Sequence, residues 1–408
     1  MPTADVAVVG AGPAGAGSAL HLARAGLDVV LVDRARFPRD KCCGDGLTTS
    51  ALRQLDALGL DPAGLPSWRA VGDVVLRGPA GHAVRLPLPA GRGVYAAVVP
   101  RIELDAALVD LARSAGVRVV EGHPCQGASV RGDRIELEVG GWGRVAARYA
   151  VGADGAWSPL RKRLTGRRRD GLGEMHALRQ YFSGVGVAAG SALHVWFEPE
   201  LAPGYAWSFP LAGGRANVGF GIQRGGRLPT GAMTALWPDL LGRAHIGEVL
   251  GPDSVAQAPH RAWPIPARIG SVALTGGGGR ALFVGDAAAA CDPLTGEGIG
   301  QALLTAELAA HAIVAAGPLD PVRAAIGYQV AVGRELRPDA VVSRLLAGVI
   351  RHRRGIRISL RMAGSTAWTR RNFARWLFED YPRAYLATPR RWRGHSLGGD
   401  GAWPPAGS

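Results

Sequence analysis

The chain contains few cysteines and very few lysines. Among its 408 residues there are four cysteines, and Lys41 and Lys162 are the only lysines. The cysteines show no spacing typical of a metal site, and the adjacent pair Cys42 and Cys43 could not easily form a relaxed disulfide. The sequence therefore predicts no metal centre and favours a reducing compartment.

Long apolar runs, internal repeats and low-complexity tracts are also missing. No uninterrupted apolar run approaches the about 20 residues of a membrane span, and the chain reaches Asp5 without the basic lead of a signal peptide. We expect a cytoplasmic protein that is soluble or peripheral at the inner face of the cell membrane. A chain of 408 residues suits two domains with an ample core.

Glycine is abundant, and the most informative glycines lie near the N-terminus. A short apolar run, 5–9, leads into the turn 10–15, which has the pattern Gly-x-Gly-x-x-Gly. Such glycines let the backbone approach a pyrophosphate at a helix N-terminus, and Asp33 follows a second apolar run where it can bind ribose hydroxyls. This context predicts a dinucleotide site rather than a plain glycine-rich turn. The positions assigned to it are Gly10, Gly12, Ala14, Gly15, Asp33 and Arg34.

Two distant segments extend this pattern. Residues 151–161 place Asp154 after a candidate strand, and residues 282–298 precede a helix predicted from Ile299 to about Ala315. In order and form the three segments resemble the flavoprotein hydroxylase-like superfamily, over roughly residues 4 to 320. The resemblance implies that FAD is the cofactor and that the aspartate of Gly285-Asp286 binds its ribityl chain.

Chemistry supports the flavin end of this assignment. Gly296-Glu297-Gly298 opens a helix, whose N-terminus suits the negative charge of a reduced flavin, although these residues could also form a simple helix-start loop. Arg101 resembles a flavin-contacting arginine of the superfamily, or is a surface charge at a helix start. The further positions assigned to FAD are Cys43, Gly44, Arg101, Asp154, Gly285, Asp286, Gly296, Gly298 and Ile299.

Two more segments indicate a family within this superfamily. The loop around Cys43-Gly44-Asp45 and the sequence Tyr-x-Trp-x-Phe-Pro at residues 205–210 together resemble the geranylgeranyl reductase family, whose members saturate isoprenoid double bonds. A proline lies two residues before Tyr205, where many members have it three before. The resemblance implies that Cys43, Tyr205 and Trp207 act at the flavin ring, with Cys43 or Tyr205 helping to deliver a proton, and that Asp45 shapes the loop. The aromatic residues could instead form one face of a core sheet.

The implied function is FAD-dependent reduction of isolated C=C bonds in an isoprenoid chain. The substrate is a polyprenyl quinone such as menaquinone, a geranylgeranyl lipid or a diphosphate. The alternatives are an FAD- and NAD(P)H-dependent aromatic monooxygenase, a non-enzymatic flavin-bound lipid carrier and a halogenase; the last is disfavoured because only a fragment of its Trp-x-Trp-x-Ile-Pro signature occurs, at 263–266. No second dinucleotide fold is evident, so the electron donor is either transient NAD(P)H or a small iron–sulfur protein such as ferredoxin.

Positive charge is concentrated near the C-terminus. Residues 341–394 contain thirteen arginines and two acidic residues, in a chain of net charge +14. A helical stripe of apolar residues runs through the start of this region: Val342, Leu345, Leu346, Val349 and Ile350. Basic amphipathic helices suit an anionic membrane surface, but a packed helical cap with a solvated basic face explains the pattern equally well. No nucleic-acid motif accompanies the charge, so no nucleic acid is expected.

The predicted fold class is α/β, with a Rossmann-like FAD-binding domain interleaved with an antiparallel-sheet substrate domain and followed by C-terminal helices. The alternating strand-like runs at 192–197 and 216–222 predict the antiparallel sheet. The expected ranges are 1–68, 100–170 and 275–320 for the FAD-binding domain, 69–99 and 171–274 for the substrate domain, 321–397 for the basic helical region and 398–408 for a flexible tail.

Overall fold

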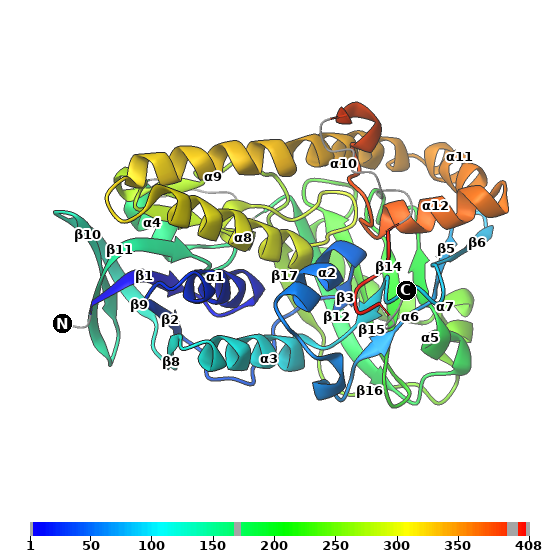
Figure 1. Ribbon diagram of the computed structural model, residues 1–408. Coiled ribbons are helices and arrows are strands. Elements are labelled where there is room, and N and C mark those ends of the chain that lie inside the picture. Colours follow the sequence, from blue (N-terminus) through cyan, green and yellow to red (C-terminus); the bar gives the residue numbers. More distant parts are fainter. Residues whose placement is uncertain (1–2, 167–172, 390–398, 405–408) are drawn as a thin grey trace.

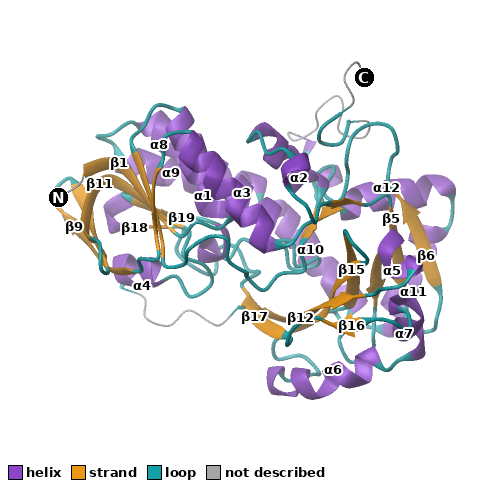
Figure 2. Cartoon of the chain, turned by 90° about the horizontal axis from the view of Figure 1, so that it is seen from below, coloured by secondary structure: helices purple, strands orange, loops and turns teal. Residues whose placement is uncertain are grey.

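The computed structural model describes residues 3–166, 173–389 and 399–404. Two eight-stranded sheets lie side by side, and long helices pack along both of them (Figure 1). The strands of a third, three-stranded sheet occur along the chain between strands of the two large sheets. Figure 2 shows the same division, with the first sheet near the N-terminus and the second at the opposite end of the molecule.

The first sheet is built on parallel strands. Its order is β18-β19-β11-β1-β2-β8, with β9 and β10 forming a hairpin beside β11. All five residues of β2 are buried, as expected for a parallel strand covered on both faces. Its strands are β1 (Thr3–Val9), β2 (Val29–Asp33), β8 (Arg118–Glu121), β9 (Cys125–Arg131), β10 (Arg134–Val139), β11 (Gly143–Gly152), β18 (Thr275–Gly276) and β19 (Ala281–Phe283).

Helices cover one face of this sheet. The apolar faces of α1 (Pro13–Arg24), α3 (Arg101–Ser114) and α8 (Ile299–Ala316) share one core cluster with the sheet. The short helix α4 (Pro159–Thr165) contributes to a second cluster, together with the β9–β10 hairpin. Helix α8 is long and apolar enough to cross a membrane by length and composition, but half of it is buried here, as in the core helix of a globular fold.

The second sheet is almost entirely antiparallel. Its order is β16-β12-β15-β14-β13-β5-β6, with β17 paired to β12, and only β13 and β5 run parallel. Its strands are β5 (Asp73–Arg77), β6 (Ala83–Pro87), β12 (Met175–Ser183), β13 (Leu193–Trp196), β14 (Ala206–Leu211), β15 (Arg215–Gln223), β16 (Val255–Ala256) and β17 (Arg261–Ile265), and the small sheet is β3 (Gly46–Leu47), β7 (Ala97–Val98) and β4 (Arg69–Ala70).

Of the remaining helices, α2 and α9 pack against α8 in the first half, and most of the others lie around the second half. Helices α11 and α12 lie against β6, and α9 runs beside α8 along the top of Figure 1. The helices are α2 (Thr49–Ala57), α5 (Val187–Ser191), α6 (Met233–Leu241), α7 (Ala244–Leu250), α9 (Pro321–Glu335), α10 (Arg337–Ile350), α11 (Arg353–Gly364) and α12 (Ala367–Leu377). Single 3-10 turns are η1 (Pro62–Gly64), η2 (Thr230–Ala232), η3 (Gly277–Gly279), η4 (Gly285–Ala288) and η5 (Tyr385–Ala387).

The predicted fold class is confirmed, including the interleaving of a parallel and an antiparallel sheet along the chain. The exact domain boundaries stay predictions. Within 69–99, which was assigned to the substrate sheet, β4 and β7 pair with β3 instead and link the two halves. The described part of the predicted tail also differs: Ala402 pairs with Val94, and Trp403 Nε1 donates to the Leu60 carbonyl, because Trp403 finds an apolar site beside Trp68.

Candidate active site

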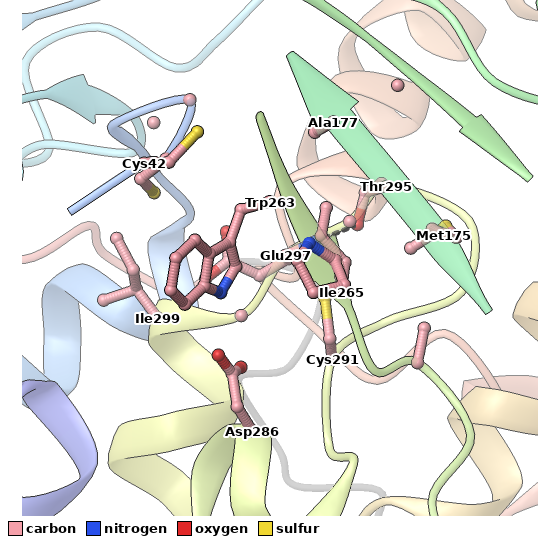
Figure 3. Close-up of a pocket in the computed structure, with 18 of the residues that line it drawn as sticks. Cys42, Met175, Ala177, Trp263, Ile265, Asp286, Cys291, Thr295, Glu297 and Ile299 are labelled. Carbon is pink, nitrogen blue, oxygen red and sulfur yellow. Dashed lines mark hydrogen bonds between the residues drawn. The ribbon is translucent and has the colours of Figure 1, made fainter. Parts of the chain in front are cut away.

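A cavity of about 1230 Å³ joins the two sheets. Ligand pockets for one small molecule usually have about 300–1,000 Å³, so this cavity has room for a cofactor and part of a second ligand. At one end it is lined by the glycine turn, Asp33 and Asp286, and at the other by strands of the antiparallel sheet and the C-terminal helices. Figure 3 shows Cys42, Trp263, Asp286, Cys291 and Glu297 around its central part.

The glycine turn at 10–15 has the close backbone packing that its sequence predicts. Gly10 has a φ of +98°, and a Cβ there would lie 2.3 Å from the Ala153 carbonyl oxygen. A Cβ at Gly15 would lie 1.7 Å from the carbonyl oxygen of Gly10. Ala14, in the first turn of α1, packs against Gly285. A Cβ added at Gly285 would lie 2.9 Å from the Cβ of Ala14. The turn is therefore tight and brings the start of α1 to the cavity.

Asp33 ends β2 at the rim of this turn. Its carboxylate accepts hydrogen bonds from the backbone N–H of Ala11 at 2.6 Å and of Ala35 at 2.8 Å. Arg34 follows it, is exposed, and also lines the cavity. The acid is thus fixed beside the glycine turn, in the position that a ribose-binding carboxylate requires.

Guanidinium groups lie over the same turn. Around a Cβ at Gly12, the closest atoms would be Nη2 of Arg101 at 3.5 Å and Nη2 of Arg39 at 3.6 Å. Both arginines pair with the buried Asp105, at 2.7 Å from Arg101 Nε and from Arg39 Nη1. Arg101 is buried at the start of α3, so it is not a surface charge. Its position suits a phosphate or the flavin edge of a dinucleotide.

Asp154 lies at the cavity wall, but its side chain serves its own loop. One carboxylate oxygen accepts from Ser158 Oγ at 2.6 Å and the other from Leu160 N at 2.8 Å. Burial raises its pKa above the ordinary value. The predicted contact of Asp154 with the cofactor stays a prediction, and the observed role of its carboxylate is to shape the start of α4.

Asp286 lines the cavity and pairs with Lys41. The two side chains form an ion pair at 3.1 Å, and both are partly exposed. Gly285, just before it, has a φ of +58°. The segment 296–298 then brings the N-terminus of α8, with Ile299 as its first residue, to the same cavity. Free backbone donors at this terminus can stabilise negative charge.

The loop at Cys43, Gly44 and Asp45 is fastened from the sheet side. The fully buried Asp45 accepts from Tyr181 Oη at 2.6 Å and from Asn217 Nδ2 at 2.7 Å. Asn217 also donates to the carbonyl of Cys43 at 2.8 Å. Burial raises the pKa of Asp45 to about 6 and also raises the pKa of the Cys43 thiol. These bonds confirm that Asp45 shapes the loop, and the Cys43 thiol keeps its proton at neutral pH.

Aromatic side chains of β14 and the residue before it form a row along the cavity. The ring centroids of Tyr205 and Trp207 lie 6.1 Å apart, and those of Trp207 and Phe209 lie 6.0 Å apart. Tyr205 Oη donates to the Thr295 carbonyl, and burial raises the pKa of this phenol. Trp207 Nε1 donates to Asn217 Oδ1 at 3.1 Å. The row is thus a cavity wall as well as a sheet face, and the indole of Trp207 has its only N–H already engaged.

The end of the cavity beyond this row is mostly apolar. Its wall combines strands of the second sheet with the C-terminal helices. Along these helices the polar lining residues are Arg344, Arg351 and Ser359. Apolar lining residues here include Leu76, Val195, Phe209, Ile350, Leu360, Phe373 and Leu377. Such a wall can hold a hydrocarbon chain but provides little to recognise a polar ligand.

Three carboxyl groups, those of Asp292, Glu297 and Glu379, lie near the buried guanidinium of Arg383, next to the start of α8. Arg383 pairs with Asp292 at 3.4 Å and with Glu379 at 3.2 Å, while Glu297 Oε1 accepts from Gly300 N at 2.6 Å. Burial raises the pKa of Glu297 to about 7 and that of Glu379 to about 8. One cation cannot balance three buried anions, so Glu297 and Glu379 retain protons near neutral pH.

The residues present fit a bound FAD. The crowded glycine turn, the fixed Asp33 and the two guanidinium groups suit its ADP half, and Asp286 suits the ribityl chain. Trp263 Nε1 and His176 Nδ1 are buried beside the cavity without a hydrogen-bond partner among the described residues. Polar atoms of this kind are usually satisfied by a ligand or by water. The fold and the site therefore define a flavin-dependent oxidoreductase.

Comparison with known proteins supports the assignment as a flavin-dependent oxidoreductase. The FAD binding domain family matches residues 3–316. The chain is 35% identical over 340 residues to the menaquinone reductase of Mycolicibacterium smegmatis, covering 78% of each chain. It is 33% identical over 333 residues to digeranylgeranylglycerophospholipid reductase 2 of Methanopyrus kandleri, covering 76% of this chain and 77% of the other.

Solved structures share the fold. A geranylgeranyl bacteriochlorophyll reductase-like protein from Thermoplasma acidophilum has a TM-score of 0.77 at 20% identity and covers 96% of this chain and 100% of its own. A mutant of the halogenase PltM, in complex with FAD, has a TM-score of 0.72 at 17% identity and covers 94% of this chain and 85% of its own. The chain belongs to the geranylgeranyl reductase family of FAD-dependent oxidoreductases. The predicted family and cofactor are confirmed, and the halogenase is a distant relative in fold.

Sequence reasoning missed the residues that anchor the loop at Cys43, Gly44 and Asp45. Tyr181 and Asn217 come from β12 and β15, and Arg179 pairs with Asp40 at 2.6 Å in the segment before the loop. One signal was present: Asn217 is a polar residue inside the otherwise apolar strand-like run 216–222. A buried amide in such a strand needs partners, which here are Trp207, Asp45 and the Cys43 carbonyl.

Proposed function

We propose that this protein saturates isolated C=C bonds in the prenyl chain of a lipid, and that a polyprenyl quinone such as menaquinone is its substrate. One observation carries the proposal: a single cavity runs from the predicted FAD site, past Cys43 and Tyr205, into an apolar chamber. The 35% identity to a menaquinone reductase supports the quinone, and the archaeal lipid reductase supports a prenyl chain as the reacting group.

The residues around the flavin end suit the chemistry of an isolated alkene. Bound FAD, when reduced, supplies a hydride, and the other carbon of the double bond needs a proton at nearly the same moment because no carbonyl can hold the charge. Cys43 and Tyr205 both keep their protons, since burial raises both pKa values. Trp207 and Phe209 position the chain and exclude water beside them.

The electron donor and the compartment belong to the same proposal. Electrons come from NAD(P)H that binds transiently or from a small iron–sulfur protein such as ferredoxin. The protein acts on the cytoplasmic side of the cell membrane, where its lipid substrate is available.

The test is anaerobic and uses the holoprotein. Dithionite-reduced protein is mixed with menaquinone and, separately, with geranylgeranyl diphosphate, and products are analysed by mass spectrometry. After the quinone head group is reoxidised in air, we expect a gain of two hydrogens per reduced bond in the prenyl chain of menaquinone, and none with dithionite in the absence of the protein. If neither compound gains mass, while oxygen, NADPH and an aromatic panel add one oxygen atom, the protein is a hydroxylase instead. FAD retained with no reaction at all would make it a lipid carrier.

The proton donors are tested in single turnover. Cys43→Ser and Tyr205→Phe should each slow alkene reduction by about 10²-fold, the contribution of a well-placed general acid. FAD content must stay unchanged. Tyr381→Phe is the matched control, because the Tyr381 hydroxyl donates to the Asn372 carbonyl and Tyr381 does not line the cavity. Unchanged rates in both variants would remove Cys43 and Tyr205 from the mechanism.

A further inference from the structure

The C-terminal helices α10, α11 and α12 have two apolar faces. Their inner face lines the cavity through Leu346, Ile350, Ile356, Leu360, Phe373 and Leu377. Their outer face, named here the C-terminal face, exposes other large apolar side chains: Leu345 (68% exposed), Val349 (47%), Ile358 (57%), Met362 (67%) and Trp368 (66%). The stripe expected from the sequence is therefore divided, because Leu346 and Ile350 turn inward while Leu345 and Val349 turn outward.

Arginines surround the C-terminal face. Arg344, Arg353, Arg354, Arg357 and Arg361 are exposed, and none forms an ion pair with a residue that the structure describes. Helices α11 and α12 contain no acidic residue. By contrast, Arg375 and Arg383, later in the same region, are buried and paired with carboxylates. The arginines that form no ion pair with a described residue thus lie beside the exposed apolar residues.

The cavity reaches the surface at the same place. Arg344 and Arg351 are exposed and also line the cavity, and Arg351 Nη2 donates to Gln223 Oε1 at 2.8 Å. The apolar lining of α10 and α11 begins directly behind these two arginines. Figure 1 shows α11 and α12 at the upper right of the molecule, with α10 leading to them along the top, away from the N-terminal sheet.

We infer that the C-terminal face lies on an anionic lipid bilayer and that a prenyl chain passes from the bilayer into the cavity between α10 and α11. The occupant is a membrane because exposed apolar side chains flanked by unpaired arginines complement the acyl region and the anionic headgroups at once. Docking follows from this surface alone. The passage of the prenyl chain rests on the proposed function.

The first test measures docking with the full-length holoprotein. Protein is sedimented with vesicles of phosphatidylglycerol and phosphatidylcholine and with vesicles of phosphatidylcholine alone. We expect binding to the anionic vesicles and little to the neutral ones. Replacing Arg354, Arg357 and Arg361 together by Gln should lower partitioning about 100-fold, since each basic residue near an anionic surface strengthens binding about fivefold.

The apolar contribution is tested by the triple substitution Leu345→Gln, Ile358→Gln and Met362→Gln. We expect most anionic binding to be lost, with FAD content and thermal midpoint unchanged because all three side chains face solvent. Val187→Gln is the matched control, since Val187 is 90% exposed on α5. Undiminished vesicle binding in both triple variants would overturn the inference, as would a dimer in solution that the apolar variant converts to monomer.

A substrate comparison separates docking from catalysis. Docking-deficient variants should reduce detergent-dispersed menaquinone at the wild-type rate but vesicle-borne menaquinone far more slowly. Equal rates on both forms would overturn the passage from the bilayer. If the wild-type protein reduces neither form, the proposed function fails, while the sedimentation result still decides the docking face.

Discussion

Asn217 connects three parts of the site with one side chain. Its amide donates to the Cys43 carbonyl and to Asp45, and it accepts from Trp207 Nε1. The side chain is fully buried, so loss of the amide leaves several polar groups without partners. This makes Asn217 a positioning residue for the loop that carries Cys43.

Asn217→Ala should lower the free energy of unfolding by about 1–3 kcal/mol, the cost of leaving buried groups unsatisfied. It should also slow substrate reduction because the Cys43 loop loses its anchor. Denaturant unfolding and single-turnover rates measure the two effects. Asn372→Ala is the control, since the Asn372 side-chain amide donates to the Trp368 carbonyl within α12, far from the Cys43 loop in the chain. Equal stability of the Asn217 variant and the wild type would contradict this role.

The glycine turn offers a second expectation for a single residue. Gly15→Ala places a Cβ within 1.7 Å of the Gly10 carbonyl oxygen, so the turn must open. We expect purified protein to contain less than about one-tenth of the wild-type FAD, because the backbone can no longer approach the pyrophosphate closely. The absorbance of bound flavin measures this. Gly64→Ala, with nothing within 4 Å of the added Cβ, should retain full FAD.

At the scale of single elements, helix α12 depends on its first turn. Thr366 Oγ1 accepts from Thr369 N at 3.0 Å, and Thr369 Oγ1 accepts from Thr366 N at 2.9 Å, which forms a reciprocal capping box. This helix packs Ala374 into the same cluster as β5 and β6. Its N-terminus therefore helps hold the C-terminal helices against the second sheet.

Thr366→Ala should cost about 1 kcal/mol of stability, the usual contribution of an N-cap. Thr366→Ser keeps the hydroxyl and should restore most of it. Chemical denaturation of both variants gives the comparison. A Ser variant as unstable as the Ala variant would show that the methyl group of Thr366, and not its cap, supports α12.

At the scale of the whole molecule, the buried acids make stability depend on pH. Burial raises the pKa of Glu297 to about 7 and of Glu379 to about 8, from an ordinary value of 4.5. Each carboxyl binds its proton more tightly in the folded state than in the unfolded state. The contribution of these two carboxyl groups to stability is therefore fully present below about pH 4.5 and is lost as the pH rises toward 8, at up to about 1.4 kcal/mol per pH unit for each acid.

Glu379→Gln should flatten this dependence between pH 5 and 8. The amide keeps the size of the side chain near Gln301 and Arg383 but no longer ionises. Unfolding midpoints across this pH range provide the measurement, with the exposed Glu248→Gln as a control. A slope equal to that of the wild type would mean that Glu379 is ionised in the folded protein throughout.

Local patterns in the sequence determined the nucleotide half of the protein. The glycine turn, the acid after β2 and the glycines before α8 depend only on backbone geometry and short spacing, so they could be found without a fold. The aromatic row at Tyr205, Trp207 and Phe209 follows from strand alternation in the same way. These local features led to the class of enzyme and its cofactor.

Only the tertiary structure decided which side chains meet. Asn217 reaches Cys43, and Arg383 reaches Asp292, across long stretches of chain, and no local pattern carries such pairings. It also decided which way each apolar residue of α10 faces, because helical spacing defines a stripe but not the two surfaces on either side of it. Here one surface is the cavity and the other is solvent, since the helices form a thin wall between them.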